Sequence, residues 1–156
     1  MHPHFAAVAE ALHPSFERLM AQEPRRTDQP WPREKVSGVY VFSENGRHLY
    51  VGRTNDVKAR YGGHCRPGAH HGIAAFAFRL AREATGKLKA TYRAGEGSRA
   101  ALAADPDFKL AFLEAKARVR AMEFRYVEER DPVRQAVLEI YCAVALETPY
   151  NDFDNH

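Results

Sequence analysis

The sequence "SGVYVFSENGRHLYVG", residues 37–52, decides the fold. Its two arms are rich in valine and aromatic residues, which favour strands, and the intervening "ENG" is a turn signal. The stretch therefore predicts a β-hairpin with one tyrosine on each arm, Tyr40 and Tyr50. Whether the two tyrosines share a face of the hairpin depends on how the turn is built.

The turn can be built in two ways. A two-residue turn of Asn45 and Gly46 places the two tyrosines on opposite faces. A three-residue loop, residues 44–46, places Tyr40 directly opposite Tyr50. We predict the second register because it separates an aliphatic face from an aromatic and polar face: Val39, Val41, Leu49 and Val51 against Tyr40, Phe42, His48 and Tyr50. Tyrosine pairs also occur in sheets for packing alone, so the hairpin by itself assigns no function.

Helical and strand patterns surround the hairpin. Residues 1–35 show a helical apolar pattern interrupted at Pro14 and then a proline-rich linker, and residues 36–156 form the main domain, with an insertion at about 66–118. The predicted elements after the hairpin are a helix from about residue 54, helices over 73–86 and 105–117, a strand over 119–127 and a helix over 132–147. This order predicts an α+β fold around an antiparallel sheet, with an N-terminal helical extension and a helical, basic insertion.

The last predicted helix carries Glu139. Its main apolar stripe, which we predict to face the core, consists of Val133, Val137, Ile140 and Val144. The residues three before and four and seven after Glu139 are also small or apolar. We therefore expect the carboxylate to border the buried face rather than lie opposite it.

Composition and charge narrow the class of protein. The 156-residue chain has 45% apolar and 28% charged residues, no apolar run long enough to span a membrane and no signal-peptide pattern. We expect a cytoplasmic protein without a membrane partner, with Cys65 and Cys142 as free thiols. Residues 36–100 hold eleven bases and four acids, a difference of +7. This basic block suits a polyanion such as nucleic acid, although it is equally consistent with an ordinary solvated surface.

The polar residues near the hairpin match a known pattern. Arg60 and His64 follow at helical i, i+4 spacing, and together with "GVY" and "YVG" they resemble the GIY-YIG nuclease superfamily, with valine in place of both isoleucines. The resemblance implies a carboxylate on a later helix and an asparagine after it. The stretch "LEIYCAVALETPYND", residues 138–152, supplies Glu139 and Asn151 in that order.

The resemblance implies a fold and an activity. The fold is a small three-stranded antiparallel sheet flanked by helices. The activity is divalent-metal-dependent endonucleolytic hydrolysis of DNA phosphodiester bonds, with one Mg²⁺ or Mn²⁺ ion held by Glu139. Tyr40 is then the general base and Tyr50 orients water or phosphate. Arg60 binds the scissile phosphate, His64 hydrogen-bonds a tyrosine or the phosphate, and Asn151 positions the tyrosine or nearby backbone.

Further basic residues are candidate contacts to the nucleic acid: Arg53, Lys58, Arg66, His70, His71, Lys87, Lys89 and Arg93. Two other interpretations stay open. The chain could be a catalytically silent nucleic-acid-binding domain with the same fold, and "HCRPGAHH", residues 64–71, contains residue types that bind zinc. The sequence does not decide between single-stranded, duplex and branched DNA.

Overall fold

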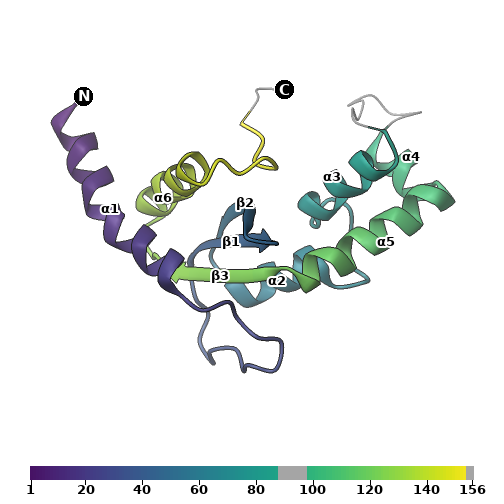
Figure 1. Ribbon diagram of the computed structural model, residues 1–156, viewed down its shortest axis with the longest axis horizontal. Coiled ribbons are helices and arrows are strands. Elements are labelled where there is room, and N and C mark those ends of the chain that lie inside the picture. Colours follow the sequence, from purple (N-terminus) through teal and green to yellow (C-terminus); the bar gives the residue numbers. More distant parts are fainter. Residues whose placement is uncertain (88–97, 154–156) are drawn as a thin grey trace. The chain divides into compact units, whose positions relative to one another are not determined.

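The computed structural model describes residues 1–87 and 98–153. The chain divides into two compact units, which are described separately below. The first unit consists of Met1–Lys58 and Glu123–His156, and the second of Ala59–Met122. Figure 1 shows that the first unit contains the strands and the helices at the two ends of the chain. Among the helices of the described residues, none combines the length and the apolar sequence that a membrane span needs.

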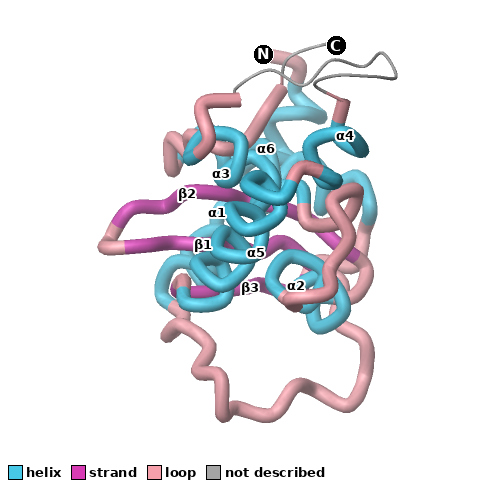
Figure 2. Tube along the Cα trace, turned by 90° about the vertical axis from the view of Figure 1, so that its right-hand side faces the viewer, coloured by secondary structure: helices cyan, strands magenta, loops and turns pink. Residues whose placement is uncertain are grey.

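The first unit is built on a three-stranded antiparallel sheet. Its strands are β1 (Gly38–Glu44), β2 (Arg47–Thr54) and β3 (Glu123–Glu128), in the order β2-β1-β3, so β2 and β3 are the edges (Figure 2). With its flanking helices this is the expected α+β fold. The third strand begins later than predicted, because residues 119–121 belong to the preceding helix.

The predicted hairpin register is wrong. Asn45 and Gly46 both have positive φ, 52° and 75°, and form a two-residue turn, so Glu44 pairs with Arg47. The register then shifts between Phe42 and Ser43, and Tyr40 pairs with Gly52 while Phe42 pairs with Tyr50. The two-residue turn alone would place the two tyrosines on opposite faces, and the register shift returns them to the same face. They lie diagonally there, with ring centroids 6.4 Å apart. His48 does not join them, since its ring bonds Ser43 at 2.8 Å.

The opposite face of the sheet carries the aliphatic core of the unit. Val39, Val41 and Val51 are fully buried there, together with residues of α1 (Pro3–Ala21) and α6 (Pro132–Ala145). The helix α1 runs through Pro14 without a break and buries Leu12 and Leu19 completely. The predicted N-terminal extension therefore contributes two fully buried side chains to the core, and the interruption expected at Pro14 does not occur.

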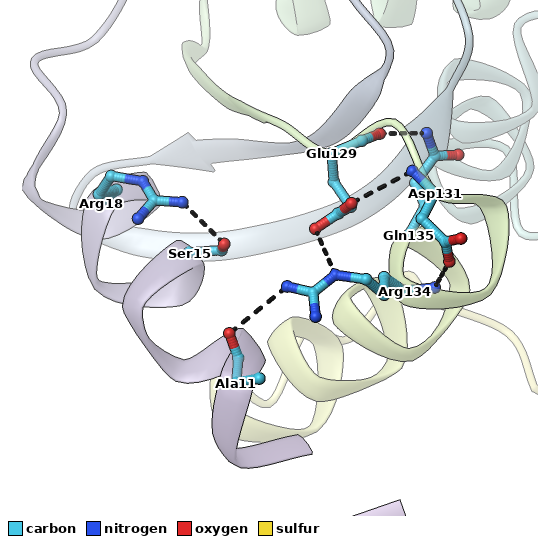
Figure 3. A network of polar contacts seen from close by, with 7 residues as sticks. All are labelled: Ala11, Ser15, Arg18, Glu129, Asp131, Arg134 and Gln135. Carbon is cyan, nitrogen blue, oxygen red and sulfur yellow. Dashed lines mark hydrogen bonds and ion pairs between the residues drawn. The ribbon is translucent and has the colours of Figure 1, made fainter. Parts of the chain in front are cut away.

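A polar network ties the first turn of α6 to the end of β3 and to α1 (Figure 3). Glu129 accepts hydrogen bonds from Arg134 Nε at 3.1 Å and from the backbone N–H of Asp131 at 3.2 Å. Arg134 also reaches the carbonyl of Ala11 at 3.5 Å, and buried Gln135 donates to the carbonyl of Glu129 at 2.9 Å. Because Gln135 also donates to the carbonyl of Thr54 at 3.3 Å, the network connects α6 to the end of β2 as well.

The predicted core stripe of α6 is mostly wrong. Val133, Ile140 and Val144 are exposed, and only Val137 of that stripe packs against the core. The buried face instead consists of Gln135, Leu138, Cys142 and Ala143. This face can include a glutamine because its amide donates to two carbonyls, that of Thr54, the last residue of β2, and that of Glu129, the residue after β3.

The second unit is helical. It holds most of α2 (Val57–Cys65), together with α3 (Ala75–Ala84), α4 (Arg99–Ala104) and α5 (Pro106–Ala121). Aromatic side chains of α3 and α5 form its core, with ring centroids of Phe78 and Phe108 5.0 Å apart and those of Phe78 and Phe112 5.7 Å apart. Gly86 follows α3 with a φ of 70°, the left-handed conformation that glycine commonly adopts just after a helix. The short helix α4 was not predicted.

Candidate active site

Tyr40 lies across the glycine of the "YVG" motif. A Cβ atom built on Gly52 would stand 2.2 Å from the Tyr40 hydroxyl oxygen and 2.4 Å from its Cζ. The end of the phenol ring therefore occupies the space above β2 that any other residue at position 52 would fill. Phe42 and Phe124 enclose the ring, with centroids 5.9 and 5.6 Å from it. The glycine thus lets the hydroxyl of a central-strand tyrosine reach the edge strand.

Gly52→Ala is expected to displace this ring and to lower the free energy of unfolding by about 1–3 kcal/mol, because the enclosing aromatic side chains leave little room for it to move. Combining the change with Tyr40→Leu should remove part of that loss. Urea denaturation of the two single variants and the double variant measures the coupling. Effects that add within about 0.5 kcal/mol would show that Tyr40 and Gly52 do not compete for this space.

Glu139 forms an ion pair with Arg53 of β2. Arg53 Nε lies 3.1 Å from Glu139 Oε2, and the two side chains are 46% and 25% exposed. Burial raises the pKa of the Glu139 carboxyl, and the neighbouring Arg53 guanidinium partly offsets that rise. The carboxylate borders the buried face of α6, as predicted, although the stripe used to predict it was wrong.

Asn151 binds the backbone of β2 on its outer edge. Its Oδ1 accepts from the N–H of Val51 and its Nδ2 donates to the carbonyl of Val51, both at 2.8 Å. Thr148 fixes the amide by donating to the same Oδ1 at 2.8 Å. Asn151 therefore takes the place of a strand residue and holds the backbone between Tyr50 and Gly52.

Three predicted residues thus act on three consecutive positions of the edge strand. Asn151 bonds Val51, Tyr40 covers Gly52 and Glu139 pairs with Arg53. Tyr40 projects from the aromatic face of the sheet, whereas α6, which carries Glu139, packs on the aliphatic face. The two side chains therefore approach β2 from opposite faces. Tyr50 lies beside Tyr40 on the aromatic face and is partly exposed.

Arg60 and His64 are described within the second unit. Both lie on α2, and Arg60 Nη1 donates to the carbonyl of Ile73 at 3.0 Å. His64 is fully buried, and burial together with the positive charge of Arg60 lowers its pKa from 6.5 to about 3. His64 is therefore a neutral imidazole at physiological pH, and at that pH it accepts or donates hydrogen bonds without carrying charge.

Acid is expected to destabilise the protein through His64. The unfolded chain binds a proton at a pKa near 6.5 and the folded chain only at about 3, so the stabilising contribution is complete above pH 6.5 and is lost as the pH falls towards 3. The loss between about pH 7 and pH 4 amounts to roughly 3 kcal/mol. Urea denaturation across this range should show a smaller pH dependence for His64→Gln, and an unchanged one for the exposed His4→Gln. An equal pH dependence in wild type and His64→Gln would contradict the assignment.

The residues predicted to contact nucleic acid differ in whether other side chains already engage them. Arg53 is engaged by Glu139, and Lys87 lies 3.8 Å from Asp105. Lys58 and Arg66 are exposed. The rings of His70 and His71 stack at 3.9 Å on the loop after α2. Lys89 and Arg93 lie outside the described residues.

Sequence reasoning missed Lys116. This lysine of α5 is 5% exposed, and its ammonium donates to the carbonyls of Pro67 and Ala69. Burial lowers its pKa. It holds the start of the loop that carries His70 and His71, which are candidate contacts. No local pattern marks it, because its partners are backbone atoms almost fifty residues earlier in the chain.

The zinc interpretation gains no support within the described part of the chain. No three His, Cys, Asp or Glu side chains there gather as a metal-binding group. Cys65 donates to the carbonyl of Tyr61, and burial raises the pKa of its thiol. Cys65 and Cys142 are both free thiols, as expected.

Comparisons of the chain with protein-family models, with curated proteins and with solved structures find no match.

Proposed function

We propose that the protein is a divalent-metal-dependent endonuclease that hydrolyses DNA phosphodiester bonds. The observation that supports this proposal best is the edge of β2, where Asn151, Tyr40 and Glu139 act on Val51, Gly52 and Arg53. An amide, a phenol and a carboxylate thus contact three successive residues of β2. All three residues are ones that the resemblance to GIY-YIG nucleases singles out.

The residues present fit a metal ion that arrives with its substrate. Glu139 offers one carboxylate, which is already partly desolvated and is balanced by a single cation. One carboxylate, completed by water and phosphate oxygens, is a usual ligand set for Mg²⁺. The ion, when bound, would polarise the phosphate and support the leaving oxygen. Glu139 would hold it, and Arg53 would then be released to contact the nucleic acid.

The chain's own residues supply the remaining chemistry. Tyr40 is the proposed general base: an ordinary phenol, with a pKa near 10, is almost fully protonated at neutral pH, and a positive charge close to it would favour the phenolate that can accept a proton. Tyr50, beside it, would orient the attacking water. Following the resemblance, Arg60 would bind the scissile phosphate with its planar guanidinium, and His64 would contribute a neutral hydrogen bond.

The second candidate is a nucleic-acid-binding domain without turnover. It needs the basic residues but none of the polar residues at β2. The filled positions 40, 50, 60, 64, 139 and 151 favour the enzyme.

A nicking assay on supercoiled plasmid separates the two candidates. The endonuclease predicts nicked and then linear DNA with Mg²⁺ or Mn²⁺, and intact plasmid with EDTA. A parallel panel of single-stranded, duplex and branched oligonucleotides, with binding measured in EDTA, identifies the substrate. Binding without cleavage of any substrate by either metal would establish the silent domain instead.

A further inference from the structure

The proline-rich segment of residues 22–36 covers the outer edge of β3. The N–H of Arg25 donates to the carbonyl of Phe124 at 2.8 Å, and the Gln22 side chain accepts from the N–H of Tyr126 at 2.9 Å. Arg125 Nε closes the contact by donating to the carbonyl of Gln22 at 2.8 Å. The segment predicted as a proline-rich linker is therefore fixed to the sheet of its own unit.

Arg25 and Trp31 of this segment form a stack of flat groups with Tyr126 of β3. The guanidinium carbon of Arg25 lies 3.7 Å from the ring centroid of Trp31, and Trp31 stacks on Tyr126 with centroids 6.2 Å apart and 30° between the planes. Arg25 is held in place by the carbonyls of Arg26 and Gln29. The flat groups are thus positioned before any ligand arrives, which reduces the entropy that binding would cost.

Two cavities open beside the stack. One, of about 570 Å³, is bounded by Arg25, Pro30 and Tyr126 among others, and the other, of about 190 Å³, by Trp31, Arg33 and Tyr126 among others. Tyr126 borders both. Planar side chains and prolines around a cavity of this kind suit flat aromatic ligands, and every nucleobase offers such a face.

The charges beside the cavities are nearly balanced. Arg26 pairs with Asp28 at 3.2 Å, and Lys35 lies 3.9 Å from Asp56. Glu23 lines the larger cavity and Glu34 the smaller one, which limits the attraction for phosphate. Two exposed cations of the smaller cavity, Arg33 and Lys58, have no ion pair or hydrogen bond with any residue that the structure describes. They are the groups available for phosphate.

We propose that this surface, the Trp31 platform (Arg25, Trp31, Arg33, Lys58 and Tyr126), binds single-stranded nucleic acid by stacking its bases at the two cavities and placing phosphates on Arg33 and Lys58. The inference rests on the proposed nuclease function, and it adds an unpaired strand to the description of the substrate. Because stacking contributes more than charge here, the affinity should depend weakly on salt. The slope of log K against log salt should be about −1.4 for two phosphates, at about −0.7 for each.

Trp31 provides a direct test because it is the only tryptophan of the chain. Oligothymidylate and oligouridylate are titrated in EDTA, which prevents metal-dependent cleavage, while tryptophan fluorescence and the anisotropy of a labelled oligonucleotide are followed. Both signals should saturate together, and a blunt duplex should bind more weakly and leave Trp31 unchanged. Binding of either oligonucleotide supports the proposal, and their ratio separates DNA from RNA.

Variants locate the binding on the platform. Tyr126→Ala should weaken it roughly 5- to 100-fold, the range that loss of one stacking side chain produces. Since Tyr126 belongs to the sheet and its loss could disturb folding, exposed Arg33→Glu provides a second variant and should flatten the salt slope by about 0.7. Lys109→Glu, the same charge change at an exposed position of α5, should have no effect.

The proposal is overturned if Trp31 fluorescence stays constant while anisotropy reports binding, if the duplex binds and quenches as well as the single strand, or if Arg33→Glu behaves like Lys109→Glu. The nicking assay is independent of these signals. Quenching of Trp31 without nicking would support the platform and contradict the nuclease proposal. Nicking without any change in Trp31 fluorescence would contradict the platform alone.

Discussion

Glu139→Gln is expected to slow metal-dependent nicking by at least about 100-fold while the protein remains as stable as the wild type. The loss of activity follows because the amide cannot replace the anionic ligand of a metal ion that contributes several kcal/mol to the transition state. The stability is retained because burial raises the pKa of the Glu139 carboxyl, so ionising this group costs more free energy in the folded chain than in the unfolded chain. A neutral side chain of the same shape removes that cost.

Glu10→Gln is the matched control, since Glu10 is an exposed acid on a helix of the same unit. Its nicking rate and its urea midpoint should equal those of the wild type. Glu139→Gln should still bind DNA in EDTA. Wild-type cleavage by Glu139→Gln would remove Glu139 from the mechanism, and loss of folding in that variant would mean that the Arg53 pair matters more for stability than its exposure indicates.

Gly38→Ala is expected to be the most destabilising single methyl addition in the hairpin. A Cβ atom at this position would lie 2.0 Å from the carbonyl oxygen of Val127 and 2.9 Å from its carbonyl carbon. Both are backbone atoms of the paired strand, so no side-chain rotation relieves the clash, and β1 must separate from β3. We expect a loss of about 3 kcal/mol or more in the free energy of unfolding, at or above the upper end of ordinary overpacking.

Gly68→Ala is the comparison, because nothing lies within 4 Å of the corresponding Cβ position and no positive φ is recorded there. It should change the free energy of unfolding by no more than about 0.5 kcal/mol, as surface substitutions usually do. Thermal unfolding followed by circular dichroism measures both variants. Equal midpoints for Gly38→Ala and Gly68→Ala would show that the two strands separate at Gly38 without cost. The glycine of the "GVY" motif would then need another explanation.

The hairpin shows which parts of the fold its sequence could predict. The alternation of valines and tyrosines correctly separated the two faces, because side chains of a strand alternate whatever its partner is. The predicted register is wrong because Asn45 and Gly46 form a two-residue turn, and because the pairing then shifts by one residue between Phe42 and Ser43. No residue at that position predicts a β-bulge. The two departures cancel, which is why the tyrosines still share a face.

The predicted buried face of the last helix is wrong for a different reason. The stripe predicted to face the core is more aliphatic than the face that the structure buries. The observed stripe includes Gln135, which can be buried only because the carbonyls of Thr54 and Glu129 accept from its amide. Such long-range partners are invisible in a local pattern. The hydrogen bonds of Asn151 to Val51, one hundred residues earlier, are equally invisible in the sequence.

The segment after α6 also covers part of the outer edge of β2. Tyr150 donates its N–H to the carbonyl of Leu49 at 3.2 Å, and Asn151 satisfies both backbone groups of Val51. Three outward hydrogen-bonding groups in the middle of β2 are therefore occupied by the chain's own later residues. An uncovered strand edge of this kind is a template for pairing between molecules, and thus for aggregation. The residues proposed to build a catalytic edge would at the same time protect the protein from self-association through it.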